Sequence, residues 1–270
     1  MAQTRPWASA GTLVIGNNSP ISNTASPRIL LFDIETAPIS GYAWTMYEAN
    51  IVSVDTPTYM LSYSAKWLGE SKQTTRALPD FSLYKKNRKS DLELVKDLWK
   101  MMDEADVIIA HNADFDIKKS NARFLANGLP PPSPYKTLCT LKIARKHFKF
   151  DSNKLDSLGG YLGVGRKLKH TGIHLWMGCI SGDMKAWNIM KKYNAQDVLL
   201  LEQCYLKLRA WATTHPNLTI YHKEEACPTC RSTSIIRRGF NFSKAGAAQR
   251  MQCRSCYAWF SGPKVRCKNA

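Results

Sequence analysis

The segment that most constrains the fold is residues 30–39, which read LLFDIETAPI. Three apolar residues followed by Asp33, Ile34 and Glu35 are typical of a buried strand that ends in two acids. Because side chains alternate along a strand, Asp33 and Glu35 point to one face and Ile34 points to the other. Two adjacent carboxylates are costly to bury unless a cation neutralises them, and hard oxygen ligands suit magnesium or manganese. The alternative is a strand end whose acids reach solvent.

Periodicity along the chain predicts an α/β class. Residues 28–34, 58–68 and 72–78 read as an antiparallel meander, and a short apolar strand follows at 106–110. A capping box at Ser90 predicts the start of a helix, and further helices are expected at 114–126, 137–148, 153–162 and 183–211. Strands first, then alternating strand and helix, indicate a mixed sheet, an antiparallel meander plus parallel strands, with flanking helices.

Composition divides the chain into three parts. Residues 1–27 are rich in Ser, Thr, Asn, Ala and Pro and predict a mobile leader. Residues 28–215 hold the predicted α/β domain, and 222–270 form a small basic module. Within the domain, residues 41–55 form a long segment rich in aromatic residues, which either contacts a substrate or covers the core.

A second acidic motif, HNADFD, follows the strand at 106–110 and opens a helix. The end of a buried strand is a usual place for site residues in α/β domains. Asp114 and Asp116 both fall in the first helical turn, where the helix dipole favours acids without any further role. The residues alone leave both interpretations open.

A third motif, YNAQD, lies in the predicted C-terminal helix. Tyr193 and Asp197 are four residues apart and share a helix face that apolar residues border. An aspartate beside a core-facing stripe needs a partner. That partner is either a metal shared with the first motif or a lysine such as Lys191 or Lys192.

Jointly the three motifs resemble those of the DEDD family of 3′→5′ exonucleases, tyrosine branch, in the ribonuclease-H-like superfamily. The resemblance covers about residues 28–212, and it implies a ribonuclease-H-like mixed sheet. The family patterns D-x-E, HN-x-x-FD and Y-x-x-x-D are matched, in that order, by Asp33 and Glu35, by His111, Asn112, Phe115 and Asp116, and by Tyr193 and Asp197.

The resemblance also implies roles. Two Mg²⁺ or Mn²⁺ ions would be held by four carboxylates, with Asp33 bridging both, Glu35 and Asp197 completing the first site and Asp116 supporting the second. Tyr193 would orient the attacking water, and the products would be nucleoside 5′-monophosphates. We expect Phe115 to pack in the core.

The cysteines predict a second metal centre. Cys227, Cys230, Cys253 and Cys256 form two C-x-x-C pairs separated by 22 residues, a spacing typical of a tetrahedral zinc site, and β-rich sequence between them favours a zinc ribbon. Four unligated cysteines are the alternative. The segment also resembles the zinc ribbons of transposase-like DNA-binding proteins. Three further cysteines lie in apolar surroundings and read as core thiols, whereas Cys267 fits no pattern; the three are Cys139, Cys179 and Cys204.

Charge points to a polyanionic partner. The chain has 38 Lys and Arg against 21 Asp and Glu, a formal net charge of +17. Basic and aromatic residues alternate in the cysteine-bearing module, a pattern that suits phosphate contact and base stacking, although aromatics also fill such small cores. The candidate nucleic-acid contacts are Asn112, Arg237, Arg238, Arg250, Arg254 and Trp259. Basic runs at 85–89, 142–149 and 166–169 could flank a substrate groove.

The resemblance, supported by the positive charge, implies a two-metal 3′→5′ exonuclease. We expect it to act on single-stranded 3′ ends, DNA more than RNA, in replication, recombination or repair, with a replication or recombination protein as a partner. The chain lacks a signal peptide and a run long enough to span a bilayer, so we expect a cytoplasmic protein of a bacterium or a phage-infected host. The alternatives are a non-cleaving nucleic-acid-binding protein and an RNA-directed or structure-specific nuclease of the same superfamily.

Overall fold

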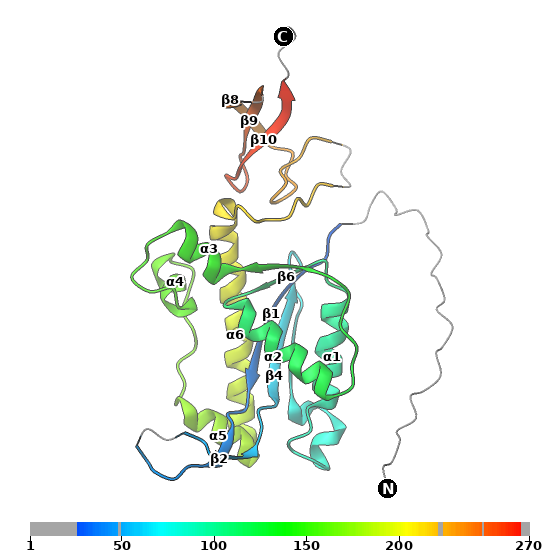
Figure 1. Cartoon of the computed structure of the whole chain (residues 1–270), viewed down its shortest axis with the longest axis vertical. Coiled ribbons are helices and arrows are strands. Elements are labelled where there is room, and N and C mark those ends of the chain that lie inside the picture. The colour runs from blue at the N-terminus through cyan, green and yellow to red at the C-terminus, as the bar shows by residue number, and fades with distance from the viewer. Residues whose placement is uncertain (1–25, 48–49, 221–223, 245, 266–270) are drawn as a thin grey trace, which may run out of the picture.

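The computed structural model describes residues 26–47, 50–220, 224–244 and 246–265 (Figure 1). The strands are β1 (Ile29–Thr36), β2 (Ser40–Tyr42), β3 (Ser53–Thr56), β4 (Met60–Trp67), β5 (Gln73–Ala77), β6 (Val107–Ala110), β7 (Lys136–Cys139), β8 (Ile235–Ser243), β9 (Gly246–Cys253) and β10 (Trp259–Val265). The α-helices are α1 (Leu92–Asp103), α2 (Ala113–Ala126), α3 (Thr140–His147), α4 (Leu155–Tyr161), α5 (Ile173–Ser181) and α6 (Met184–Leu208). Short 3₁₀ turns lie at η1 (Leu78–Asp80), η2 (Ser82–Lys85) and η3 (Arg209–Trp211).

The main sheet has five strands in the order β5-β4-β1-β6-β7. Strands β5, β4 and β1 pair antiparallel, whereas β1, β6 and β7 pair parallel. Helices flank this sheet, and a small three-stranded sheet, β10-β9-β8, follows it in the chain (Figure 1). The predicted fold class, a mixed sheet with an antiparallel meander, parallel strands and a small C-terminal module, is confirmed.

Two local predictions are wrong, and one helix was not predicted. Residues 137–148 are not one helix, because Thr137 and Leu138 pair with β6 as the last parallel strand before α3 begins. A helix, α5, follows the basic loop where none was predicted. The capping box at Ser90 does not form. Asp91 holds the N-cap position of α1, and its buried carboxylate instead accepts hydrogen bonds from the Met60 amide at 2.8 Å and from Arg123 at 2.7 Å.

Strand β1 divides the core, as strand alternation requires. Leu30, Phe32 and Ile34 join the apolar cluster that contains α1 and α2. Ile29 and Leu31 join the cluster that contains α3, α4 and the second half of α6. The odd-numbered positions, which include Asp33 and Glu35, therefore face α6.

Helix α6 is tied to the sheet by polar contacts as well as apolar ones. The Lys66 ammonium on β4 donates to both carboxylate oxygens of Glu202 at 2.7 Å, and both side chains are about nine-tenths buried. The Gln73 amide on β5 donates to the backbone oxygen of Ala195 at 2.8 Å. Because a buried ion pair demands close geometry, these contacts fix the register of α6 over the sheet.

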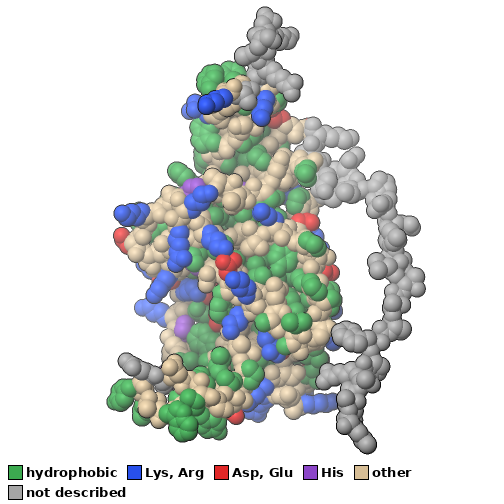
Figure 2. All heavy atoms as spheres, viewed as in Figure 1, with side chains coloured by type: hydrophobic (Ala, Val, Ile, Leu, Met, Phe, Trp, Pro, Cys, Tyr) green, Lys and Arg blue, Asp and Glu red, His purple; other side chains and the backbone are tan. Residues whose placement is uncertain are grey.

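Strands β2 and β3 form a separate two-stranded hairpin that projects beside α5. Its aromatic side chains are exposed: Tyr42 is 68%, Trp44 88% and Tyr47 86% exposed. Hydrophobic side chains accordingly gather at the lower left of Figure 2. The described residues of the 41–55 segment are exposed, so they do not cover the core, contrary to one of the two interpretations.

The cysteine-bearing module lies against the C-terminal end of α6 (Figure 1). Its buried cysteines pack with Ala210 of η3, and the Leu218 amide donates to the Pro228 backbone oxygen at 2.8 Å. The three predicted core thiols are buried, as expected. Cys267 and residues 1–25 of the predicted leader lie outside the described residues. In the described ranges, each helix is too short or too polar to cross a bilayer.

Candidate active site and zinc centre

Three of the four predicted acids converge. Asp33 and Glu35 come from β1, Asp197 comes from α6, and each offers a carboxylate oxygen within 4.8 Å of the others. Strand alternation aims the first two at α6, and Asp197 meets them from the helix face that covers the sheet. Asp197 is 1% exposed.

Asp116 adjoins this cluster at the backbone of β1. It lies in the first turn of α2, it is buried, and its carboxylate accepts a hydrogen bond from the Ile34 amide at 3.4 Å. Asn112, at the left-handed φ of 64°, makes the turn from β6 into α2 and is exposed. Because Asp116 faces inward, the preceding Phe115 faces outward and is 45% exposed, so its predicted core position is wrong. Asp114 is also exposed and pairs with Lys142 at 2.7 Å.

The buried amide of Asn194 holds Asp33. Its Nδ2 donates to Asp33 Oδ2 at 2.7 Å, and its Oδ1 accepts from the Ser62 hydroxyl on β4 at 3.2 Å. Since the hydroxyl of Ser62 can supply the proton, this second bond directs the NH₂ group toward Asp33. Sequence reasoning missed Asn194, although a polar residue beside Tyr193 on a buried helix was a usable signal.

Lys167 links Tyr193 with Asp197. Its ammonium donates to Asp197 Oδ2 at 2.6 Å and to the Tyr193 hydroxyl at 3.0 Å. The lysine partner that we considered for Asp197 therefore comes from the loop after α4, whereas Lys191 pairs with Asp80. Sequence reasoning noted the basic run at 166–169, but nothing in that run distinguishes this lysine from its neighbours.

Burial perturbs the acids strongly. It raises the pKa of Glu35 to about 8, with repulsion from Asp197 adding to the effect, and it raises the pKa of Asp116 to about 7. The pKa of Asp33 is well above its ordinary value, first because of burial and then because of its acidic neighbours. Burial raises the pKa of Asp197 as well, against the opposing charge of Lys167. The cluster therefore favours protons or a metal cation over free carboxylates.

The donor set fits a catalytic metal. Asp197 Oδ1 is buried and has no hydrogen-bond partner among the described residues, whereas Oδ2 is bound to Lys167. An unpartnered buried carboxylate oxygen is costly, and a divalent cation would satisfy it. One ammonium cannot neutralise Asp33, Glu35 and Asp197 together. Hard carboxylate oxygens at this spacing suit Mg²⁺ or Mn²⁺.

His111 serves the architecture of this region. One ring nitrogen, Nδ1, lies 2.9 Å from the Thr140 hydroxyl, and Nε2 lies 2.9 Å from the backbone oxygen of Asn153. Burial lowers its pKa to about 4, so the ring is neutral near pH 7. A neutral imidazole has one donor, which must serve the Asn153 oxygen. The histidine thus ties the end of β6 to the segment before α4.

The comparison with known families agrees with this geometry. A family model described as RNase_H superfamily matches residues 30–209, which include every acid discussed above. The chain belongs to the RNase H superfamily. Membership suggests a phosphodiesterase and implies nucleic-acid binding in general. A search among curated proteins found no match.

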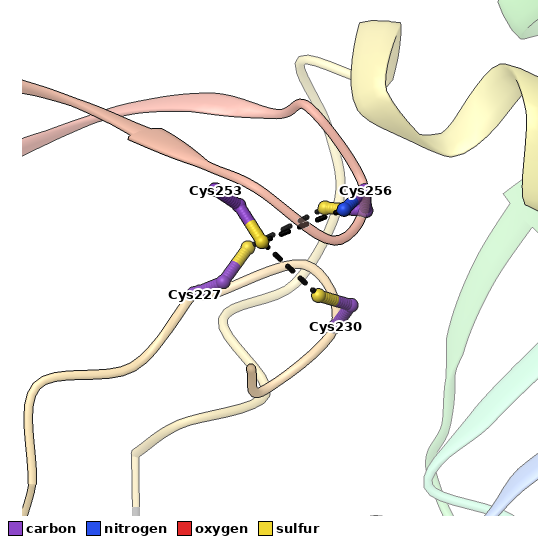
Figure 3. Close-up of side chains that lie close together, drawn as sticks. All are labelled: Cys227, Cys230, Cys253 and Cys256. Atoms are coloured by element: carbon purple, nitrogen blue, oxygen red, sulfur yellow. Dashed lines mark hydrogen bonds between the residues drawn. The ribbon is translucent and has the colours of Figure 1, made fainter. Parts of the chain in front are cut away.

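The cysteine cluster lies outside the RNase H match and forms a centre of its own. Figure 3 shows the four side chains pointing toward one another from two loops. The Sγ atoms of Cys227 and Cys256 are 3.6 Å apart, as are those of Cys230 and Cys253. Tetrahedral zinc with Zn–S bonds of about 2.3 Å requires S···S distances of about 3.8 Å. The contact between Cys227 and Cys256 lowers the pKa of the first thiol and raises that of the second, so the pair shares a proton that a metal would displace, because thiolates are the form that binds metal. The cluster fits structural zinc and is consistent with a zinc ribbon.

The predicted nucleic-acid contacts on this module are exposed. Arg238 and Arg254 face solvent, and the Arg250 guanidinium lies 5.4 Å above the ring centre of Trp259. Arg237 forms a salt bridge with Glu225 at 2.9 Å. Exposed arginines beside an aromatic ring suit a nucleic-acid strand, but these contacts remain a prediction.

Proposed function

We propose that this RNase H superfamily member is a metal-dependent 3′→5′ exonuclease of the tyrosine-branch DEDD type. It hydrolyses nucleic acid, DNA in preference to RNA, to nucleoside 5′-monophosphates. The observation that carries the proposal is the convergence of Asp33, Glu35 and Asp197, with the Tyr193 hydroxyl linked to that cluster through Lys167. An acidic strand end alone would not supply this combination of acids and a phenol.

The residues divide the work. Asp33, Glu35, Asp116 and Asp197 would hold two Mg²⁺ or Mn²⁺ ions, whose Lewis acidity would activate water near neutral pH and stabilise the leaving 3′ oxygen. Tyr193 orients the attacking water through its hydroxyl. Burial and the charge of Asp197 raise the pKa of Tyr193, so the phenol stays protonated and can donate a hydrogen bond.

The zinc module supplies nucleic-acid affinity in this proposal. Residues 28–215 act as the catalytic unit and contact the strand through Asn112. Residues 222–270 form a transposase-like ribbon whose surface also binds the strand. The ribbon residues that contact it are Arg237, Arg238, Arg250, Arg254 and Trp259. The protein would act in the cytoplasm in replication, recombination or repair, together with a protein of one of those processes.

Substrate trimming tests the proposal. Single strands of DNA and RNA, and their duplexes, are labelled at either end and incubated with Mg²⁺ or Mn²⁺. We expect progressive shortening from the 3′ end of single-stranded DNA and release of mononucleotides. Asp33→Ala should abolish shortening, whereas the matched control Asp114→Ala, an exposed acid of the second motif, should retain it.

Three outcomes would contradict the proposal. Activity that survives in both Asp33→Ala and Asp197→Ala would overturn the site assignment. Internal cuts would indicate a structure-specific nuclease. Tight binding without any cleavage by the unaltered protein would favour a non-cleaving nucleic-acid-binding role.

A further inference from the structure

A cleft lies on the outer side of α2 and α3, away from the clustered acids. Its volume is about 420 Å³, and β7 and residues 212–214 close it. The floor is apolar and includes Ile117, Ile143 and Ala212. Lysines form the rim, namely Lys118, Lys142 and Lys146. An apolar floor below a cationic rim suits a ligand that is flat and apolar on one side and anionic on the other.

The rim is positively charged overall. Lys142 pairs with Asp114 at 2.7 Å, and Asp114 is the single acid among the described residues that line the cleft. Lys146 donates to the Thr213 hydroxyl at 2.8 Å, which holds its ammonium at the cleft wall. All three lysines are exposed, so they are available to an incoming polyanion. Figure 2 shows Lys and Arg side chains over this face of the molecule.

Along the chain, one wall of the cleft adjoins the second acidic motif and the other precedes the cysteine-bearing module. Its α2 wall begins two residues before Asp116, on the face of the helix opposite to that buried acid. Its far wall, residues 212–214, follows η3 and leads into the cysteine-bearing module, which lies against the same end of α6. A strand that reaches both the catalytic acids and the ribbon therefore has a contact surface between them.

We propose that this cleft binds one nucleotide unit of a nucleic-acid strand, with the base on the apolar floor and the flanking phosphates on the lysine rim. The inference rests on the proposed function, because it assigns a path to the substrate of that site. Phosphate contact by lysines supplies affinity without sequence preference, and contact of the base with the floor is equally indifferent to base identity. The cleft extends the strand contact beyond the reacting end.

The test compares two charge-matched triple variants. The cleft variant is Lys118→Gln with Lys142→Gln and Lys146→Gln. The control is Lys72→Gln with Lys96→Gln and Lys100→Gln, three exposed lysines that lie outside the predicted basic runs, do not line the cleft and change the net charge equally. Binding of a labelled single strand is measured by fluorescence anisotropy over a salt series, with Asp33→Ala in every protein so that cleavage does not interfere.

We expect the cleft variant to bind the strand about ten- to a hundredfold more weakly near 0.1 M salt. The slope of log affinity against log salt should become shallower by about 2, because each phosphate contact to a single strand contributes about 0.7. The control should change affinity less than about twofold, since it alters only the long-range field. Equal losses in the two variants, or no loss in the cleft variant, would overturn the proposal.

Two further arms separate the competing explanations. If a nucleoside 5′-monophosphate binds the cleft as tightly as the strand does, the occupant is a free nucleotide and the proposal fails. Trimming of a short oligonucleotide by the cleft variant, with Asp33 intact, should equal that of the unaltered protein. Absence of trimming by the unaltered protein would refute the proposed exonuclease, whereas the salt series would still decide the cleft.

Discussion

Replacing Asn194 with alanine tests how the buried polar contacts prepare Asp33 for a cation. The Asn194 side chain is fully buried, its Nδ2 donates to Asp33 Oδ2 at 2.7 Å, and Ser62 fixes the direction of the amide. Hydrogen bonds to a charged group contribute about 1.5–3 kcal/mol. Asn194→Ala removes this stabilisation from the ionised form of Asp33 and not from its protonated form. The substitution should therefore change the pKa of Asp33 and its affinity for a metal ion.

The sign follows from the protonation of Asp33. Burial and neighbouring acids already raise its pKa, and the loss of the amide donor would raise that pKa further. Near pH 7 a metal must therefore displace a more tightly held proton. We expect Mn²⁺ affinity to fall about tenfold or more, as is typical when a group that orients a metal ligand is removed. The deficit should shrink as pH rises, because the metal-free carboxylate then loses the same hydrogen bond.

Calorimetric titration with Mn²⁺ over a pH series measures this directly, at temperatures where melting curves show that each variant is folded. Ser62→Ala should give a smaller loss of affinity, since the amide stays but is no longer directed. Gln203→Ala, which removes an exposed amide from the same helix, is the matched control and should leave affinity unchanged. If Asn194→Ala lowers only thermal stability, or if its deficit is the same at every pH, the reasoning is refuted.

Three further predictions concern stability and the zinc centre. Because burial raises the pKa of Glu35 to about 8 and that of Asp116 to about 7, the folded metal-free protein holds protons that the unfolded chain releases from about pH 4 upward. Its free energy of unfolding, measured with urea, should therefore fall as the pH rises from about 5 to 8, by up to about 1.4 kcal/mol per pH unit for each acid. Bound Mn²⁺ should reduce that fall. A free energy of unfolding that does not change with pH would contradict the pKa shifts. Cys253→Ser should lower zinc, measured by elemental analysis, from about one ion per chain to almost none while the main α/β domain keeps its melting transition; an unchanged zinc content would exclude the four-thiolate site. Glu202→Gln should destabilise the protein by about 3–5 kcal/mol in urea unfolding because it leaves the buried Lys66 charge unpaired, and the apolar double substitution Lys66→Met with Glu202→Leu should recover most of that loss.

Local periodicity was sufficient to predict in which direction the site side chains point from their own strand or helix. Alternation along β1 placed Asp33 and Glu35 on one face, and that face is the one that α6 covers. Helical spacing placed Tyr193 and Asp197 together, and Lys167 contacts both. The C-x-x-C pairs likewise predicted a compact thiol cluster, because each pair places its two sulfurs in one tight loop.

Local pattern failed where a distant element decided the outcome. Residues 137–139 became a strand because β6 offered a parallel edge to pair with. The capping box predicted at Ser90 did not form, because the Glu93 carboxylate that would complete it accepts hydrogen bonds from the Ser82 hydroxyl and the Leu83 amide. In each case a long-range contact is stronger than the local preference, which amounts to a few tenths of a kcal/mol to about 1 kcal/mol.

By itself, the sequence determined which residues can supply chemistry and which way each points from its own strand or helix. The tertiary structure alone decided their partners: Asn194 beside Asp33, Lys167 between Tyr193 and Asp197, and the lysine-rimmed cleft between α2, α3 and residues 212–214. The reason is physical. Repeats of two and 3.6 residues fix side-chain direction within one element, whereas the approach of separate elements depends on packing of the whole core, which no local repeat encodes.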